Sequence, residues 1–209
     1  MKRLLFFGDS LTDMSRVRNK YDTSVFSYGT GFVFFLKAYL DESYPNEYEV
    51  INRGIGGNRI VDLARRYKKD VIEEKPDVIT ILIGVNEILL DCMIRGMGTP
   101  LEKFKKVYKE MLDDIKRELP EVSFILMEPF YLDAPEIHKH IQRFDALKNY
   151  QDAIKEIAKE YNAVFLSLQK KLSEEATTHK SSDILYDGIH TNALGAKLIA
   201  DEWMKGFKL

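Results

Sequence analysis

Five short apolar runs, each followed by a segment whose apolar residues recur at helical spacing, constrain the fold of this chain most strongly. The run over residues 78–83 is nearly all apolar, which is typical of a strand covered by helices on both faces. Strands that alternate with helices predict a parallel sheet with right-handed crossovers, here an α/β protein built as a three-layer α/β/α sandwich. The five predicted strands span residues 3–7, 48–52, 78–83, 123–127 and 164–168.

Apolar residues at helical spacing predict helices between these strands. Two segments, residues 14–28 and 88–98, have no clear period and are expected to be irregular. Thr99, Pro100 and Glu102 form a typical helix start, with a capping residue, a first-turn proline and a capping-box glutamate. The expected helices cover approximately residues 29–43, 60–71, 99–115, 142–161 and 194–203.

The length of 209 residues suits a single domain over residues 1–209. The chain is 45% hydrophobic, which excludes disorder, and its net charge of −2 provides no basic surface for nucleic acid. Cys92 is the only cysteine, so no internal disulfide can form, and no apolar run is long enough to cross a membrane. We therefore expect a cytoplasmic protein without nucleic-acid or membrane partners; its aromatic content is compatible with a homo-oligomer.

Ser10 directly follows the first predicted strand, at the end of the sheet where ligands bind in α/β proteins. A serine needs a base to become nucleophilic, and Asp187 and His190 stand together just before the last predicted helix. Their spacing lets the carboxylate reach one ring nitrogen while the other faces a serine hydroxyl. Taken alone, the pair fits a helix-capping aspartate and a surface histidine better than a catalytic pair.

Acyl transfer at such a serine also needs hydrogen-bond donors for the oxyanion. The glycine-rich turn over residues 54–57 can offer backbone N–H groups, because glycine allows a close approach. Asn86 follows the third predicted strand and can offer its side-chain amide, and the Ser10 backbone N–H is a third donor. Each feature also has a purely structural explanation as a turn, but all of them are expected at one edge of the sheet.

These blocks resemble the SGNH, or GDSL-type, esterase and lipase family. The resemblance implies a flavodoxin-like α/β/α hydrolase fold, Ser10 as nucleophile, His190 as base and Asp187 as its orienting acid. It also implies Ser10, Gly57 and Asn86 as oxyanion-hole donors, with no cofactor and no metal. The matching blocks are GDSLTD at residues 8–13, NRGIGGN at 52–58, GVNE at 84–87 and DGIH at 187–190.

Within that family, the stretches GDSLTDMSRVR, YGTGFV, INRGIGGN and MEPFY look most like bacterial intracellular acetyl-xylan esterases and related sugar O-acetyl esterases. This resemblance implies a small acylated substrate such as an acetylated xylo-oligosaccharide. Arg16 and Arg18 in the first irregular segment, together with Tyr186, are the candidate substrate contacts. Glu87 stands where the family usually has an aspartate, and we interpret it as a scaffold for its loop.

Two other functions fit parts of the sequence. A lysophospholipase or thioesterase would use the same triad on longer acyl chains, with an apolar wall over residues 88–90. A non-catalytic flavodoxin-like binding module would use RGIGGN to cradle phosphate, but no dinucleotide or P-loop fingerprint follows the first strand.

Two polar pairs could suggest a metal site. Asp9 and Asp13 flank Ser10, and we interpret them as acceptors for backbone N–H groups that fix the loop. His138 and His140 have no third ligand nearby in sequence, which favours a solvated loop.

Overall fold

The computed structural model describes residues 1–19 and 21–207 of the chain, which contain one parallel five-stranded sheet. Its strand order is β2-β1-β3-β4-β5, and every neighbouring pair runs parallel. This confirms the predicted α/β class and the number of strands. The strands are β1 (Lys2–Gly8), β2 (Tyr48–Gly54), β3 (Val78–Leu82), β4 (Ser123–Met127) and β5 (Val164–Leu166).

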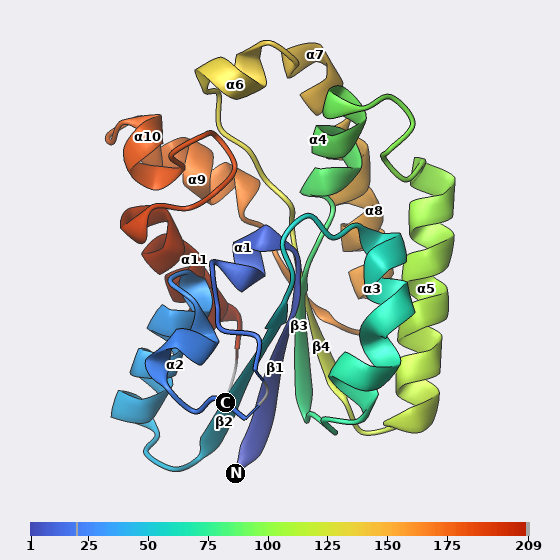
Figure 1. The fold of residues 1–209 in the computed structure, drawn as a ribbon, viewed down its shortest axis with the longest axis vertical. Coiled ribbons are helices and arrows are strands. Elements are labelled where there is room, and N and C mark those ends of the chain that lie inside the picture. Colours follow the sequence, from blue (N-terminus) through green and yellow to red (C-terminus); the bar gives the residue numbers. More distant parts are fainter. Residues whose placement is uncertain (20, 208–209) are drawn as a thin grey trace.

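Helices cover both faces of the sheet, as Figure 1 shows. On one side, α2 (Phe32–Ser43) packs against α11 (Ala193–Gly206). On the other side, α5 (Leu101–Glu118) contacts both α3 (Ile60–Tyr67) and α8 (Leu147–Glu160). Because both faces are covered, the strand interiors are apolar on both sides, which explains the continuous apolar runs in the sequence.

The last helix is anchored to the first strand through the core. Trp203 of α11 is fully buried and packs on Phe6 of β1, with their ring centroids 5.6 Å apart. Its indole N–H donates to the Thr80 hydroxyl of β3 at 2.9 Å, so the only polar atom of the ring is satisfied. The two ends of the chain are therefore joined through the centre of the sheet.

The central strands end level with one another. Gly8, the last residue of β1, pairs with Gly54 at the end of β2 and with Leu82 at the end of β3. The turns that follow these three strands consequently meet at one edge, as the sequence predicts for a parallel sheet.

The predicted helix boundaries need several corrections. Residues 88–98 are not irregular throughout, because α4 (Val85–Met93) occupies most of the segment. Its inner face is formed by four residues at helical spacing: Val85, Ile88, Leu89 and Cys92. The first of them, Val85, belongs to the GVNE block, so the repeat begins before residue 88. In the described part of the first irregular segment, residues 14–19 and 21–28, the structure has a single 3₁₀ turn, η1 (Val25–Tyr28).

Thr99 does not cap α5, because the N-cap is Pro100 and no side chain caps this helix. The Thr99 backbone is used instead to tie three segments together: its N–H donates to Glu87 and its carbonyl accepts from the Tyr150 hydroxyl. The helix expected over 142–161 is divided into α7 (Ile141–Phe144) and α8, and α3 continues as a π-helical turn, η2 (Lys68–Ile72).

Four short helices complete the described structure. Three of them lie in the carboxyl-terminal half, and none of the helices in the described residues has the length and apolar character needed to cross a membrane. The four are α1 (Ser10–Asp13), α6 (Pro135–His138), α9 (Gln169–Glu175) and α10 (Ser181–Ile184).

Candidate active site

Ser10 is the first residue of α1, a single helical turn that begins as soon as β1 ends. Asp9 is the N-cap, and its Oδ1 accepts the backbone N–H of Leu11 at 3.0 Å. Gly8, the last residue of β1, lies so close to β3 that a Cβ atom there would be 2.3 Å from the carbonyl oxygen of Leu82. The glycine at the end of the strand therefore allows this close packing two residues before Ser10.

Asp187 and His190 lie on a turn between α10 and α11 and face Ser10. The Nε2 atom of His190 is 2.8 Å from the Ser10 hydroxyl oxygen, and its Nδ1 atom is 2.6 Å from Asp187 Oδ2. Asp187 Oδ1 accepts two backbone N–H groups of the same turn, from Ile189 at 3.0 Å and His190 at 2.7 Å. The carboxylate therefore fixes both the turn and the imidazole, and the structure brings the three predicted residues together in one hydrogen-bonded row.

The electrostatics of this row favour a histidine that can accept a proton. The hydrogen bond with Asp187 raises the pKa of His190 above its usual value, although partial burial opposes this effect. Burial raises the pKa of Asp187, but hydrogen bonds from His190 and the turn outweigh it, so the net pKa is lowered. With Asp187 ionised, the neutral imidazole donates from Nδ1 and presents Nε2 as an acceptor to the serine hydroxyl.

The three predicted oxyanion donors also lie at this edge. Gly57 adopts a φ of +78°, a left-handed conformation that glycine adopts at little cost. Asn86, in the first turn of α4, donates from Nδ2 to the carbonyl of Asn58 at 3.0 Å, so its amide lies against the Gly56–Asn58 turn. Neither Ser10 nor Gly57 uses its backbone N–H in a hydrogen bond to another described residue.

Glu87 holds the segments around these donors together. It is almost fully buried, with Oε1 accepting the Ile60 N–H at 2.7 Å and Oε2 accepting the Thr99 N–H at 2.9 Å. Burial raises the pKa of this carboxyl. The interpretation of Glu87 as a loop scaffold is confirmed by these contacts, because both oxygens bind backbone groups at the starts of neighbouring helices.

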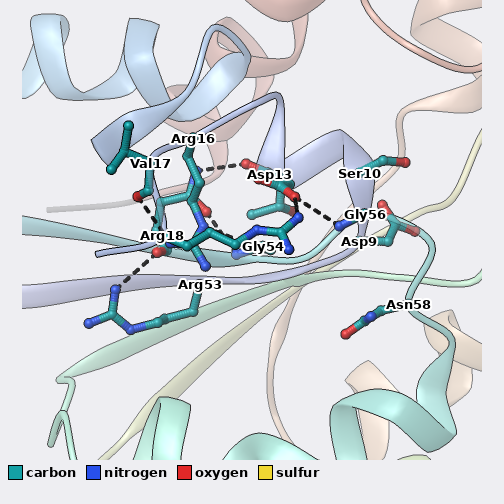
Figure 2. Close-up of polar contacts among 12 residues, drawn as sticks. Asp9, Ser10, Asp13, Arg16, Val17, Arg18, Arg53, Gly54, Gly56 and Asn58 are labelled. Carbon is teal, nitrogen blue, oxygen red and sulfur yellow. Dashed lines mark hydrogen bonds and ion pairs between the residues drawn. The ribbon is translucent and has the colours of Figure 1, made fainter. Parts of the chain in front are cut away.

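Asp13 is the second acceptor in this region that binds a distant backbone group. Its Oδ2 accepts the N–H of Gly56 at 2.9 Å and forms an ion pair with Arg18 at 2.5 Å (Figure 2). The prediction that Asp9 and Asp13 accept backbone N–H groups is thus confirmed for both residues. Within residues 1–19 and 21–207, no group of three or more His, Cys, Asp or Glu side chains is arranged to hold a metal ion.

A cavity of about 530 Å³ opens above Ser10 and His190. All three predicted substrate contacts, Arg16, Arg18 and Tyr186, line it. Tyr186 is 56% exposed and its ring stacks on that of His190 at 5.7 Å, so it presents a free aromatic face.

The two arginine side chains differ in their exposure and in their hydrogen bonds. Arg18 has an exposed side chain that reaches the cavity from the loop after α1. Arg16 is buried, and its Nε donates to the carbonyl of Gly54 at 2.9 Å, so this side chain also binds the loop after α1 to the end of β2 (Figure 2).

Several residues that hold the site together are not identified by sequence reasoning. Asn52 donates from Nδ2 to the carbonyls of Thr12 and Tyr28, and Arg66 donates to the carbonyl of Gly8 at 2.9 Å. Asparagine in a strand and arginine on a helix are ordinary surface residues in a sequence. Only the sheet order, which places β2 beside β1, reveals their partners.

Comparisons with known proteins found a matching family model and similar solved structures. The model of the GDSL-like Lipase/Acylhydrolase family matches residues 6–198. An acetylxylan esterase of Geobacillus stearothermophilus is 33% identical over 211 residues, covering 98% of this chain and 93% of that protein. The crystal structure of an acetylxylan esterase from the same organism has a TM-score of 0.85 at 29% identity, covering 99% of this chain and 95% of that one. A crystal structure from Parabacteroides merdae, described as a GDSL-like lipase, has a TM-score of 0.93 at 28% identity, with coverage of 98% and 94%.

Proposed function

Because the chain belongs to the GDSL-like lipase/acylhydrolase family and is a carboxylic ester hydrolase, we propose that Ser10 is its nucleophile and that His190 and Asp187 complete a catalytic triad. The observation that carries this proposal is the 2.8 Å contact between His190 Nε2 and the Ser10 hydroxyl oxygen. That distance lies within the reach required of a general base for the proton it removes.

In the acylation step, the Ser10 oxygen attacks the ester carbonyl carbon while His190 Nε2 takes the serine proton. Asp187 stabilises the imidazolium through its 2.6 Å contact with Nδ1. The carbonyl oxygen becomes an oxyanion, for which the N–H groups of Ser10 and Gly57 and the amide of Asn86 are the proposed donors. Collapse of this intermediate breaks the bond to the alcohol, which leaves with the proton from His190.

Water completes the cycle at the same groups. It enters as the alcohol leaves, His190 removes one of its protons, and the resulting hydroxide attacks the acyl-enzyme carbonyl. The second tetrahedral intermediate returns the Ser10 oxygen, which recovers its proton from His190, and the acid is released. Every proton transfer uses Nε2 of one imidazole.

We propose small acetylated sugars or xylo-oligosaccharides as the substrate. The similarity to acetylxylan esterases supports this class, and so does a cavity lined mainly by polar side chains and one free aromatic face. An exposed guanidinium and a tyrosine ring suit sugar hydroxyls and the apolar faces of sugar rings. Arg18 and Tyr186 are the proposed contacts.

The alternatives receive less support. A long-chain acylhydrolase would need an apolar wall beside Ser10, but Ile88 lies in the hydrophobic core, and none of residues 88–90 lines the cavity. The hypothesis of a non-catalytic binding module is wrong, because the chain is a member of an esterase family and resembles an acetylxylan esterase over nearly its whole length.

The test is a ratio of two rates measured with Ser10→Ala as the blank. Acetate release from acetylated xylo-oligosaccharides is compared with hydrolysis of an octanoyl ester. We expect a strong preference for the acetyl sugar and a loss of at least about 10³-fold in Ser10→Ala, with an unchanged circular dichroism spectrum. Activity retained by Ser10→Ala would refute the nucleophile, and an octanoyl preference would refute only the substrate.

A further inference from the structure

The helix α1 carries two functional groups at its opposite ends. Ser10 is its first residue and Asp13 its last, and Asp13 is 5% exposed. Asp13 points toward the turn after β2, where its Oδ2 accepts the Gly56 N–H at 2.9 Å. Figure 2 shows this carboxylate between Arg18 and Gly56, with Ser10 on the far side of the helix turn.

The turn and α1 are in direct contact at several points. A Cβ atom at Gly54 would lie 2.2 Å from the backbone nitrogen of Asp13, so the two backbones touch. The Ile55 N–H donates to the carbonyl of Gly8 at 3.1 Å, which fixes the start of the turn on the end of β1. The bond from Gly56 to Asp13 fixes the next peptide group.

Gly57, the proposed oxyanion donor, follows immediately. Two successive glycines have more conformational freedom than any other pair of residues, so their N–H directions are poorly defined unless something holds them. An oxyanion donor contributes only if it is oriented before the charge develops. The orientation of the Gly57 N–H therefore depends on what fixes the Gly56 peptide.

We propose that Asp13 is a positioning residue for the oxyanion hole: by accepting the Gly56 N–H, it orients the following peptide so that the Gly57 N–H faces Ser10. This inference depends on the proposed function, because it assumes that an oxyanion forms at Ser10. Arg18 binds the same Oδ2 atom and fixes the carboxylate from the solvent side. The single turn of α1 then fixes the position of the Gly57 N–H relative to the Ser10 hydroxyl.

The second oxygen of Asp13, unpaired within the described part of the chain, suggests that this residue is kept for function rather than for stability. Asp13 Oδ1 is buried and has no hydrogen-bond partner among the described residues. A buried polar atom without a partner lowers stability, and natural proteins tolerate such local costs chiefly at functional sites.

The experiment compares Asp13→Ala, which removes the acceptor, with Asp13→Asn, which keeps an oxygen that can accept the Gly56 N–H. For each variant, kcat and KM are measured on one acetyl ester, together with the Kd of methylboronic acid. This compound adds to the Ser10 oxygen as a tetrahedral adduct and places a boron-bound oxygen where the oxyanion forms. Its affinity reports the oxyanion hole separately from substrate binding.

Glu128→Gln is the matched control. Glu128 is a buried carboxylate whose Oε2 accepts from the Ser167 hydroxyl and the Gln169 N–H, both at 2.9 Å, and it does not line the cavity. It tests whether disturbing any buried carboxylate that binds a backbone N–H has the same effect. Thermal unfolding of all variants shows which of them remain folded.

We expect Asp13→Ala to lower kcat by about 10- to 100-fold, less than or equal to the loss of one whole oxyanion donor. KM should change by less than about threefold, and the boronate Kd should rise in parallel with the loss of kcat. Asp13→Asn should keep at least about a third of kcat, and Glu128→Gln should leave kcat and the boronate Kd unchanged.

The proposal is overturned if Asp13→Ala keeps its kcat and boronate affinity, or if Asp13→Asn loses as much as Asp13→Ala. If Asp13→Ala does not fold, the comparison of Asp13→Asn with Glu128→Gln still decides: a boronate Kd weakened more than about tenfold in Asp13→Asn overturns the acceptor role. Ser10→Ala is measured in the same series. Activity in Ser10→Ala refutes the proposed function itself, whereas an inactive Ser10→Ala beside a fully active Asp13→Ala refutes only the positioning role.

Discussion

The buried carboxyl of Asp9 should make the stability of this protein depend on pH in a way that one isosteric substitution removes. Asp9 is completely buried beside Ser10, and within residues 1–19 and 21–207 the only hydrogen bond to its side-chain carboxylate comes from the Leu11 N–H. Its Oδ2 atom has no partner among the described residues. Burial raises the pKa of Asp9 from 3.8 to about 7, with the charges of His190 and Glu87 acting in opposite directions.

The sign of the effect follows from proton binding. Between pH 4 and pH 7 the folded protein holds the Asp9 proton, whereas the unfolded chain has released it. Folding takes up a proton over this interval, so the free energy of unfolding falls as the pH rises. A pKa of about 7 in place of 3.8 gives an upper limit of about 4 kcal/mol for the pH-dependent change in the free energy of unfolding, at about 1.4 kcal/mol per pH unit.

Asp9→Asn keeps an oxygen for the Leu11 N–H but has no proton to lose. Any cost of burying the amide is the same at every pH and cancels when two pH values are compared. We therefore expect the stability of Asp9→Asn relative to the native chain to rise by about 2–4 kcal/mol between pH 4.5 and pH 7.5. Urea unfolding followed by circular dichroism measures this difference.

Asp41→Asn, at an exposed position of α2, is the control. Its stability relative to the native chain should change much less between the two pH values. If the difference between Asp9→Asn and the native chain is the same at both pH values, the argument from burial is refuted.

Three further predictions concern the same edge of the sheet. Asp187→Asn removes the hydrogen bond that raises the pKa of His190, so the acid limb of the kcat/KM profile should move to lower pH and kcat should fall by about 10³- to 10⁴-fold; an unmoved limb would contradict the pairing. Glu87→Ala leaves two backbone N–H groups without an acceptor and should lower the free energy of unfolding by about 2–5 kcal/mol in urea, whereas a value near zero would show that the loops do not depend on it. Gly57→Ala places a Cβ in open space. It should lower the free energy of unfolding by only about 1–2 kcal/mol, because alanine is strained at a positive φ. Gly54→Ala would collide with Asp13 and should not yield folded protein; equal melting temperatures for these two glycine variants would refute that distinction.

The strands are largely predictable from sequence because each is buried on both faces and reads as an uninterrupted apolar run. Their parallel arrangement then places the turns after β1, β2 and β3 at one edge, and this is sufficient to bring Ser10 near the Gly54–Gly57 turn. Helix boundaries are less predictable, since they depend on packing. The helical repeat of α4 begins at Val85, inside the GVNE block, in which only Asn86 and Glu87 carry a sequence-based interpretation.

The supporting contacts of the site are harder to predict because their partners are distant in sequence. Gly56 and Asp13 are 43 residues apart, and nothing in either local sequence identifies the other. The hydrogen-bonded row from Ser10 to His190 spans 180 residues. It can be hypothesised because serine chemistry requires a base and because the blocks at both ends resemble those of one family. Chemical requirement thus predicts the reacting groups, whereas the residues that hold them follow from topology.

The contact of Trp203 with Phe6 and Thr80 has a consequence for how the site forms during folding. Trp203 is the only tryptophan in the chain, and it belongs to the helix that follows the His190 turn. A folding intermediate with the sheet complete but α11 undocked would contain Ser10 and the glycine turn without their base. The fluorescence of Trp203 therefore reports the docking of α11, which is the step that brings His190 to Ser10.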